Sequence, residues 1–284
     1  MNTQLESVRR FRAANPPRTR WSVRAGHVIA VGAGKGGVGT STVAALLASA
    51  AAREGSALLV DGVPAVGGLS TMLNAPAGPG ITGLRGDAAE PRDVLTALSD
   101  RLTLARSGVA PDTDEPAPSG AEWRVLVRRL SRLWGEFDHV VIDAGSRLDT
   151  VVAALESGAG RLVVVTDPGR IAVTAAYALM KAAWSHAPEL AVDLVVNRAG
   201  SAEARGVTQV LATALDRFLD QSAELAGAVP NDPTLATSVE AGTLLEQTPD
   251  RCRAVRAARE ILARLAAPVS APIDGPAQLR LMEA

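Results

Sequence analysis

Cysteine is almost absent from this sequence of 284 residues, in which Cys252 is the only one. A single thiol forms neither an internal disulfide nor a thiolate metal cage, so we expect a reducing compartment. Long apolar runs are absent as well. None reaches the length of a membrane-spanning helix, and the first residues lack the apolar core of a signal peptide. These absences predict a cytoplasmic protein.

Net charge and lysine are also scarce. The 29 basic and 30 acidic side chains leave a formal net charge of -1. This balance gives no overall attraction to nucleic acid, and we expect no specific nucleic-acid partner. Lysine occurs only at Lys35 and Lys181, and all other basic residues are arginines. Because lysine is so rare in this chain, the position of Lys35 is of interest.

Apolar runs alternate with stretches of helical spacing in the body of the chain. Strands are predicted over residues 27–32, 57–60, 101–105, 139–142, 162–165 and 192–196. Helices are predicted over residues 42–53, 123–134, 172–184, 207–219 and 251–265. Strands that are apolar throughout and alternate with helices are typical of a parallel sheet covered on both faces. The sequence therefore predicts an α/β fold with a mostly parallel sheet and helices on both faces.

Three segments are expected along the chain. Residues 1–25 form an arginine-rich arm, residues 26–267 form one α/β domain, and residues 268–284 form a flexible tail rich in Pro and Ala. The last predicted helix, 251–265, is amphipathic, and we expect its apolar side to dock on the core. Peripheral association with the inner face of the cell membrane stays open.

A glycine-rich loop joins the first predicted strand to the first predicted helix. Residues 34–41 read GKGGVGTS. Glycines let backbone N–H groups curl around phosphate oxygens, and the helix N-terminus adds a favourable dipole. In the phosphate-loop pattern G-x-x-x-x-G-K-S/T, Gly34, Gly39 and Ser41 match, but Thr40 stands at the lysine position. We expect this loop to bind the phosphates of a nucleotide.

Residues 34–42 resemble the deviant Walker A motif of the MinD/ParA family, GKGGxGKST. The resemblance implies that Lys35 reaches the nucleotide of the partner subunit in an ATP-bound homodimer. It also implies that Ser41 binds Mg²⁺, and that Thr40 replaces the lysine that holds the β- and γ-phosphates in relatives. The loop residues implied to contact ATP or ADP are Gly34, Gly36, Gly37, Val38, Gly39, Thr40, Ser41 and Thr42.

Two aspartates follow apolar strands in the order of the same family. Asp61 ends the run LLVD and Asp143 ends HVVID, and the resemblance places both at the Mg²⁺ site, partly through water. Together with Lys35 they are the candidate catalytic residues. Relatives read V-D-A-D, where the second acid is associated with placing the attacking water, and Val63 occupies that position. Loss of this acid and of the lysine at Thr40 removes transition-state stabilisation, so hydrolysis is expected to be weak or lost.

Further segments resemble the FlhG/FleN flagellar number regulators within that family. Residues 174–181 read TAAYALMK, close to TDAYALIK in those proteins. The run DLVVNR places Asn197 at the adenine-reading position, and GAVPND places Pro230 beside the base. The resemblance therefore implies a regulator of flagellar number or placement that acts through partner binding.

The N-terminal arm adds a candidate partner site. FlhG proteins begin with a D-Q-A-x-x-L-R motif that stimulates the GTPase of their partner FlhF. Gln4, Val8 and Arg9 fall at the Q, L and R positions of this motif. The resemblance thus implies a FlhF-like GTPase or another flagellar protein as partner.

Two other functions stay open. An active ParA- or MinD-like ATPase that positions DNA or the septum would need other groups to replace Thr40 and Val63. A pseudo-ATPase localisation factor of the CpaE/TadZ type fits the altered loop. Those proteins commonly carry an additional receiver-like domain, which the 25 residues before the fold cannot encode.

Overall fold

The computed structural model describes residues 28–65, 68–86, 88–109, 116–242, 248–249 and 251–266. They contain an eight-stranded sheet with the order β3-β4-β2-β5-β1-β6-β7-β8. The strands are β1 (Val28–Ala33), β2 (Ala57–Asp61), β3 (Leu95–Ala97), β4 (Leu102–Ala105), β5 (His139–Gly145), β6 (Arg161–Thr166), β7 (Ala191–Asn197) and β8 (Glu224–Val229). Neighbouring strands are parallel except β3 and β4, which confirms the predicted α/β fold.

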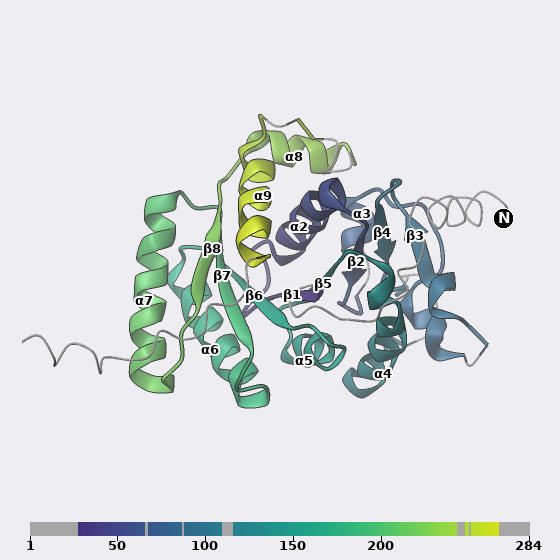
Figure 1. Ribbon diagram of the computed structural model, residues 1–284, viewed down its shortest axis with the longest axis horizontal. Helices are drawn as coiled ribbons and strands as arrows, with labels where there is room; N and C mark the ends of the chain where they lie inside the picture. Colours follow the sequence, from purple (N-terminus) through teal and green to yellow (C-terminus); the bar gives the residue numbers. More distant parts are fainter. Residues whose placement is uncertain are drawn as a thin grey trace, which may run out of the picture.

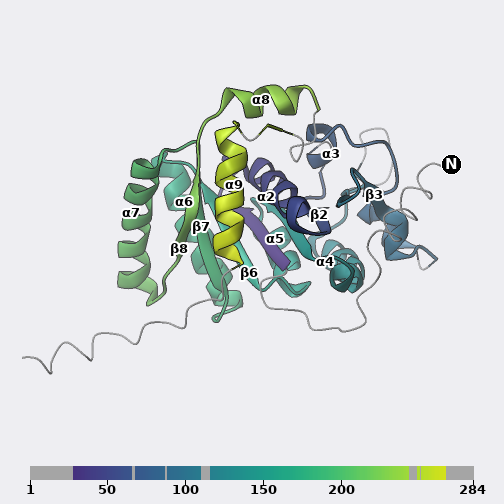
Figure 2. The ribbon, with the colours of Figure 1, turned by 45° about the horizontal axis from the view of Figure 1, so that its top comes forward.

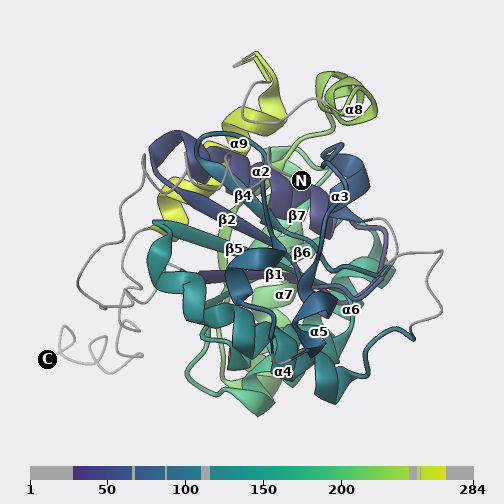
Figure 3. The same cartoon turned by 90° about the vertical axis from the view of Figure 1, so that its right-hand side faces the viewer.

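Helices cover both faces of this sheet (Figure 1). The α-helices are α2 (Thr40–Glu54), α3 (Leu69–Met72), α4 (Gly120–Leu130), α5 (Leu148–Glu156), α6 (Arg170–His186), α7 (Ser201–Leu219), α8 (Pro233–Glu240) and α9 (Arg253–Leu265). The 3-10 turns are η1 (Ile81–Arg85), η2 (Pro91–Val94) and η3 (Ser131–Glu136). Helices α2 and α9 lie on one face, and α4 to α7 lie on the other (Figures 2 and 3).

The position of β1 inside the sheet explains why its sequence is apolar throughout. All six of its residues are buried. Val28 and Ala30 belong to the core under α4 to α7, whereas Ile29 and Val31 belong to the core under α2 and α9. Successive side chains of a strand point to opposite faces, so a strand buried on both faces cannot show the polar alternation of a half-exposed one.

Some elements differ from the prediction. The edge strands β3 and β8, and the short helix α5, were not predicted, because β3 has three residues and β8 reads ELAGAV without a long apolar run. The helix predicted over 123–134 begins at Gly120 as α4 and changes into η3 after Leu130. Its start is fixed by a capping box, in which Ser119 Oγ accepts from Glu122 N and Glu122 accepts from Ser119 N.

Helix α9 docks on the core as the sequence predicts. Its apolar residues are buried against α2 and the sheet, and they are Val255, Ala258, Ile261, Leu262 and Leu265. This side of α9 therefore faces protein. Within the described ranges no helix combines the length and apolar character needed to cross a membrane. The proposed arm (1–25) and tail (268–284) lie outside the described residues.

Candidate functional site

The glycine-rich loop lies between the end of β1 and the start of α2. Gly37 and Gly39 have φ angles of 83° and 91°, in the left-handed region that favours glycine. Gly34 packs so closely on α6 that a Cβ there would lie 1.9 Å from the carbonyl oxygen of Ala175. Val38 is buried in the core and anchors the loop. The local sequence thus folds into a backbone turn that ends at a helix N-terminus, as a phosphate loop requires.

Two residues at the end of β7 hold this loop in place. Asn197 Nδ2 donates to the carbonyl oxygen of Val38 at 2.8 Å, and Arg198 Nη1 donates to that of Gly37 at 3.1 Å. Arg198 has a φ of 56°, which is unusual for a residue other than glycine. Asn197 is predicted to read adenine, and in the structure its buried amide positions the loop. Arg198 was missed as a site residue, although it follows Asn197 directly in the sequence.

Replacing Gly39 by alanine is expected to lower the free energy of unfolding by about 1–3 kcal/mol. A Cβ at Gly39 would lie 2.2 Å from Asn197 Nδ2, and the left-handed φ adds strain. Gly37→Ala is the matched control, because it shares the left-handed φ but meets nothing within 4 Å. Urea unfolding should show a larger loss for Gly39→Ala. Equal losses would mean that the contact with Asn197 contributes nothing.

Asp61 and Asp143 lie side by side in the sheet, next to the first turn of α2. They are register partners on the neighbouring parallel strands β2 and β5, and both are buried. The hydroxyl of Ser41, in the first turn of α2, hydrogen-bonds Asp143, and Gly145 N donates to Asp143 Oδ1 at 3.0 Å. Burial raises the pKa of Asp143 against the lowering effect of Ser41. The structure thus brings together the three residues predicted for Mg²⁺.

Asp61 carries the most perturbed charge of this cluster. Burial, together with the nearby Asp143 carboxylate, raises the pKa of Asp61 from its usual 3.8 to about 8. Within the described part of the chain, Asp61 Oδ2 is buried without a hydrogen-bond partner. A cation or a water bound to it would satisfy this oxygen. Mg²⁺ typically takes one or two carboxylates and completes its shell with phosphates and water, so Asp61, Asp143 and Ser41 fit a Mg·nucleotide.

Asp61→Asn is expected to flatten the pH dependence of stability in buffer without Mg²⁺ and nucleotide. In the folded protein Asp61 keeps its proton up to about pH 8. In the unfolded chain the Asp61 carboxyl group loses its proton near the usual pKa of 3.8. Between these values the folded state binds one proton more, so this contribution to the free energy of unfolding falls as pH rises. A full proton corresponds to about 1.4 kcal/mol per pH unit.

Urea unfolding between about pH 5 and 8 checks this prediction. The decline with pH should be shallower in Asp61→Asn than in the unmodified protein. Asp216→Asn, at an exposed position of α7, is the control and should leave the decline unchanged. Parallel curves for Asp61→Asn and the unmodified protein would contradict the raised pKa.

Comparison with known proteins identifies the family. A family model described as cellulose biosynthesis protein BcsQ matches residues 27–219, more than half of the chain. The chain belongs to this MinD/ParA-like family. It is 30% identical over 227 residues to the antiactivator FleN of Pseudomonas aeruginosa, and the alignment covers 75% of this chain and 76% of FleN.

Solved structures of the MinD/ParA family share the fold. The cell division ATPase MinD of Pyrococcus furiosus matches with a TM-score of 0.70 at 21% identity, covering 84% of this chain and 98% of MinD. MinD of Pyrococcus horikoshii, solved with Mg-ADP, matches with a TM-score of 0.69 at 19% identity, covering 84% and 96%. At these identities the likeness shows the fold alone.

Thr40 and Val63 depart from the pattern of the MinD/ParA family, whereas Lys35 keeps it. Thr40, the first residue of α2, is only 8% exposed and brings no charge to the loop. Val63 packs closely on Gly145, because a Cβ added at Gly145 would lie only 2.6 Å from a methyl group of Val63. An apolar contact therefore occupies the place expected for the second acid. Lys35 lies on the loop surface, and its Nζ donates to the carbonyl oxygen of Gly36 at 2.9 Å.

The remaining predicted residues are placed as follows. Pro230 follows β8, whose last residue Val229 is the register partner of Asn197, so Pro230 lies at the same edge of the sheet as the loop. Thr42 is half-buried in the first turn of α2, and Gly36 is exposed. The partner candidates Gln4, Val8 and Arg9 lie outside the described residues.

Proposed function

We propose that this chain is a nucleotide-binding regulator of the FleN type, which binds Mg·ATP or Mg·ADP and acts through a partner protein. The observation that carries the proposal is the loop itself. Its glycines take the left-handed turns of a phosphate loop, and Ser41 at its end hydrogen-bonds Asp143, the register partner of Asp61. In this proposal Asn197 and Pro230 lie on the side of the base, and Lys35 reaches the nucleotide of a second copy in an ATP-bound homodimer.

The relationship to FleN supports a regulatory output. FleN is described as an antiactivator, and three quarters of this chain aligns with it. We therefore propose control of flagellar number or placement, with a FlhF-like GTPase or another flagellar protein as partner. Gln4, Val8 and Arg9 are the proposed contacts of that partner. The expected place of action is the cytoplasm, and the buried apolar side of α9 gives membrane association no support.

Hydrolysis is proposed to be weak or lost. Thr40 supplies no charge for the β- and γ-phosphates, and Val63 supplies no acid for the attacking water. Steady-state phosphate release at saturating Mg·ATP should stay close to the buffer background. The double variant Thr40→Lys/Val63→Asp, which puts back both groups of the family motif, should exceed it. Sustained turnover by the unmodified chain would instead favour a ParA- or MinD-like ATPase that positions DNA or the septum.

The Val63–Gly145 contact also favours a second candidate function. An apolar contact at a catalytic position is compatible with a pseudo-ATPase localisation factor of the CpaE/TadZ type. Such a scaffold would not respond to nucleotide. Its signature would be partner binding that is the same with and without Mg·ATP, whereas the FleN-type regulator should bind its partner differently in the two conditions.

A further inference from the structure

The outer side of α4 and the turn after it carry a concentration of positive charge. Arginine occupies four of the nine positions 124–132, and none of the nine is acidic. The chain as a whole has a formal net charge of -1, so this cluster is a local feature. The four side chains are Arg124, Arg128, Arg129 and Arg132, and we call them the α4 arginine cluster.

Only part of the cluster is used within the fold. Arg129 donates to the carbonyl oxygens of Leu84, Gly86 and Ala89 and so ties α4 to the η1 segment. Arg124 Nη1 lies 3.7 Å from Glu156 Oε1. The exposed guanidinium groups of Arg128 and Arg132 have no hydrogen bond or ion pair with any residue that the structure describes.

The spacing of these arginines is unfavourable for the helix alone. Arg124 and Arg128 are four residues apart on α4, and like charges at this spacing repel one another on a helix. Arg132 adds another positive charge in η3. Helix α9 is also rich in arginine, but there Arg264 donates to the carbonyl oxygen of Ala226 and Arg253 to that of Asn231. Arg128 and Arg132 have no such internal role among the described residues, and together they fit an external partner of opposite charge.

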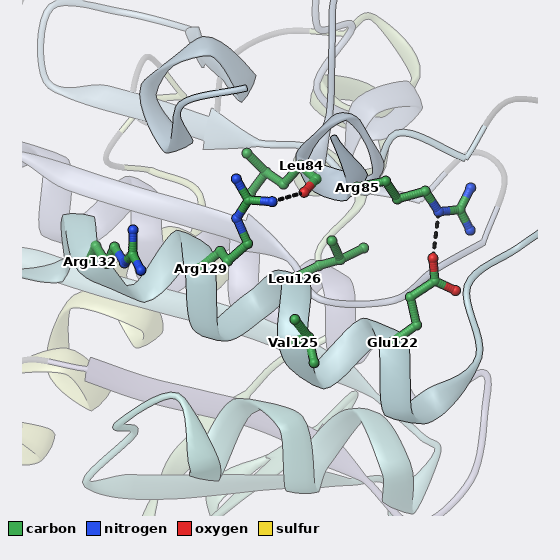
Figure 4. A pocket seen from close by; sticks show the side chains of 7 residues that line it. All are labelled: Leu84, Arg85, Glu122, Val125, Leu126, Arg129 and Arg132. Carbon is green, nitrogen blue, oxygen red and sulfur yellow. Dashed lines mark hydrogen bonds and ion pairs between the residues drawn. The ribbon is translucent and has the colours of Figure 1, made fainter. Parts of the chain in front are cut away.

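The surface around the cluster is hollowed and partly apolar (Figure 4). A cavity of about 520 Å³ lies between α4 and Leu84–Arg85, and a second of about 440 Å³ lies towards Glu156 at the end of α5. Both are lined by Val125, Arg129 and Arg132, so the ridge of α4 separates two neighbouring hollows. Val125 is 59% exposed on this ridge.

We propose that this side of α4 is a docking surface for an acidic segment of a partner protein. Carboxylates of that segment would pair with Arg128 and Arg132, and an apolar side chain would cover Val125. Charge complementarity is the basis of this assignment. A protein fits better than a nucleic acid, because the exposed side chain of Val125 offers an apolar contact beside the arginines. This surface does not depend on the proposed nucleotide function.

Fluorescence anisotropy with the full chain tests the proposal. The probe is a labelled peptide of glutamates with leucines at helical spacing, at physiological ionic strength. Arg128→Glu/Arg132→Glu is expected to weaken binding at least about tenfold, and Val125→Ser should weaken it to a smaller degree. A probe with lysine in place of glutamate should bind this double variant but not the unmodified chain.

Arg205→Glu/Arg256→Glu is the matched control, because it makes the same change of charge at exposed positions of α7 and α9. It should keep binding within about twofold. Absence of peptide binding, equal loss in the control, or tighter binding of duplex DNA with the same sensitivity to Arg128 and Arg132 would each overturn the proposal. Mg·ATP binding by the same variants, measured in parallel, reports separately on the proposed nucleotide function.

Discussion

Replacing Lys35 by alanine is expected to abolish the proposed self-association of this chain in saturating Mg·ATP. Lys35 lies on the surface of the loop, and its Nζ bonds to the neighbouring carbonyl of Gly36. It is therefore available to a nucleotide held by a second copy. Loss of a charge-assisted hydrogen bond costs about 1.5–3 kcal/mol, and a symmetric dimer would lose two of them. This corresponds to at least about a hundredfold weaker dimer.

Light scattering with and without Mg·ATP measures this effect. Lys181→Ala is the control, since it removes the other lysine of the chain from the exposed side of α6. The control should dimerise normally, and Lys35→Ala should stay monomeric although it still binds nucleotide. If Lys35→Ala dimerised with ATP as the unmodified chain does, the proposed role of Lys35 across the dimer would be wrong.

Replacing Thr40 by lysine is expected to tighten ATP binding about 10- to 150-fold. Thr40 begins α2 directly after the left-handed turn at Gly39, where a lysine side chain could follow the loop to the phosphates. The gain is the free energy of one charge-assisted hydrogen bond, about 1.5–3 kcal/mol. It should be larger for ATP than for AMP, because the restored charge acts on the terminal phosphates.

Isothermal titration with ATP and AMP measures the gain from Thr40→Lys. Thr40→Met is the control, since it adds length without charge and should bring no comparable gain. If both variants bound ATP equally, packing at the start of α2 would explain the change. If neither differed from the unmodified chain, the loop would not hold the phosphates as proposed, or Arg198 would already supply the missing charge.

The parts of the site that are continuous in sequence could be predicted from it. Residues 34–42 are continuous in sequence. A glycine pattern between an apolar strand and a helix predicts both the shape of the loop and the class of ligand that it binds. Asp61 and Asp143 each end an apolar strand, and the resemblance to the MinD/ParA family predicts their place at the Mg²⁺ site. Parallel neighbouring strands then bring their ends together, as the register of β2 and β5 confirms. The sheet was predicted for the same reason, since strands buried on both faces read as apolar runs.

The parts that depend on distant contacts could not be predicted. Asn197 and Val38 are 159 positions apart, and no local pattern shows that the amide of one holds the carbonyl of the other. The orphaned oxygen of Asp61 and the packing of Val63 on Gly145 exist only once the strands are assembled. The edge strand β8 was not predicted, because a half-buried strand with glycine and alanine lacks the apolar run that is typical of the central strands.

The central claim is that the altered loop still makes this chain a nucleotide switch. Its most direct test is an equilibrium titration of the full chain with Mg·ATP and with Mg·ADP, recording heat and molecular mass together. The account predicts micromolar binding of both nucleotides and dimerisation with ATP alone. Absence of binding at millimolar nucleotide would contradict it, and the fold would then act as a scaffold whose function lies in its partner surfaces.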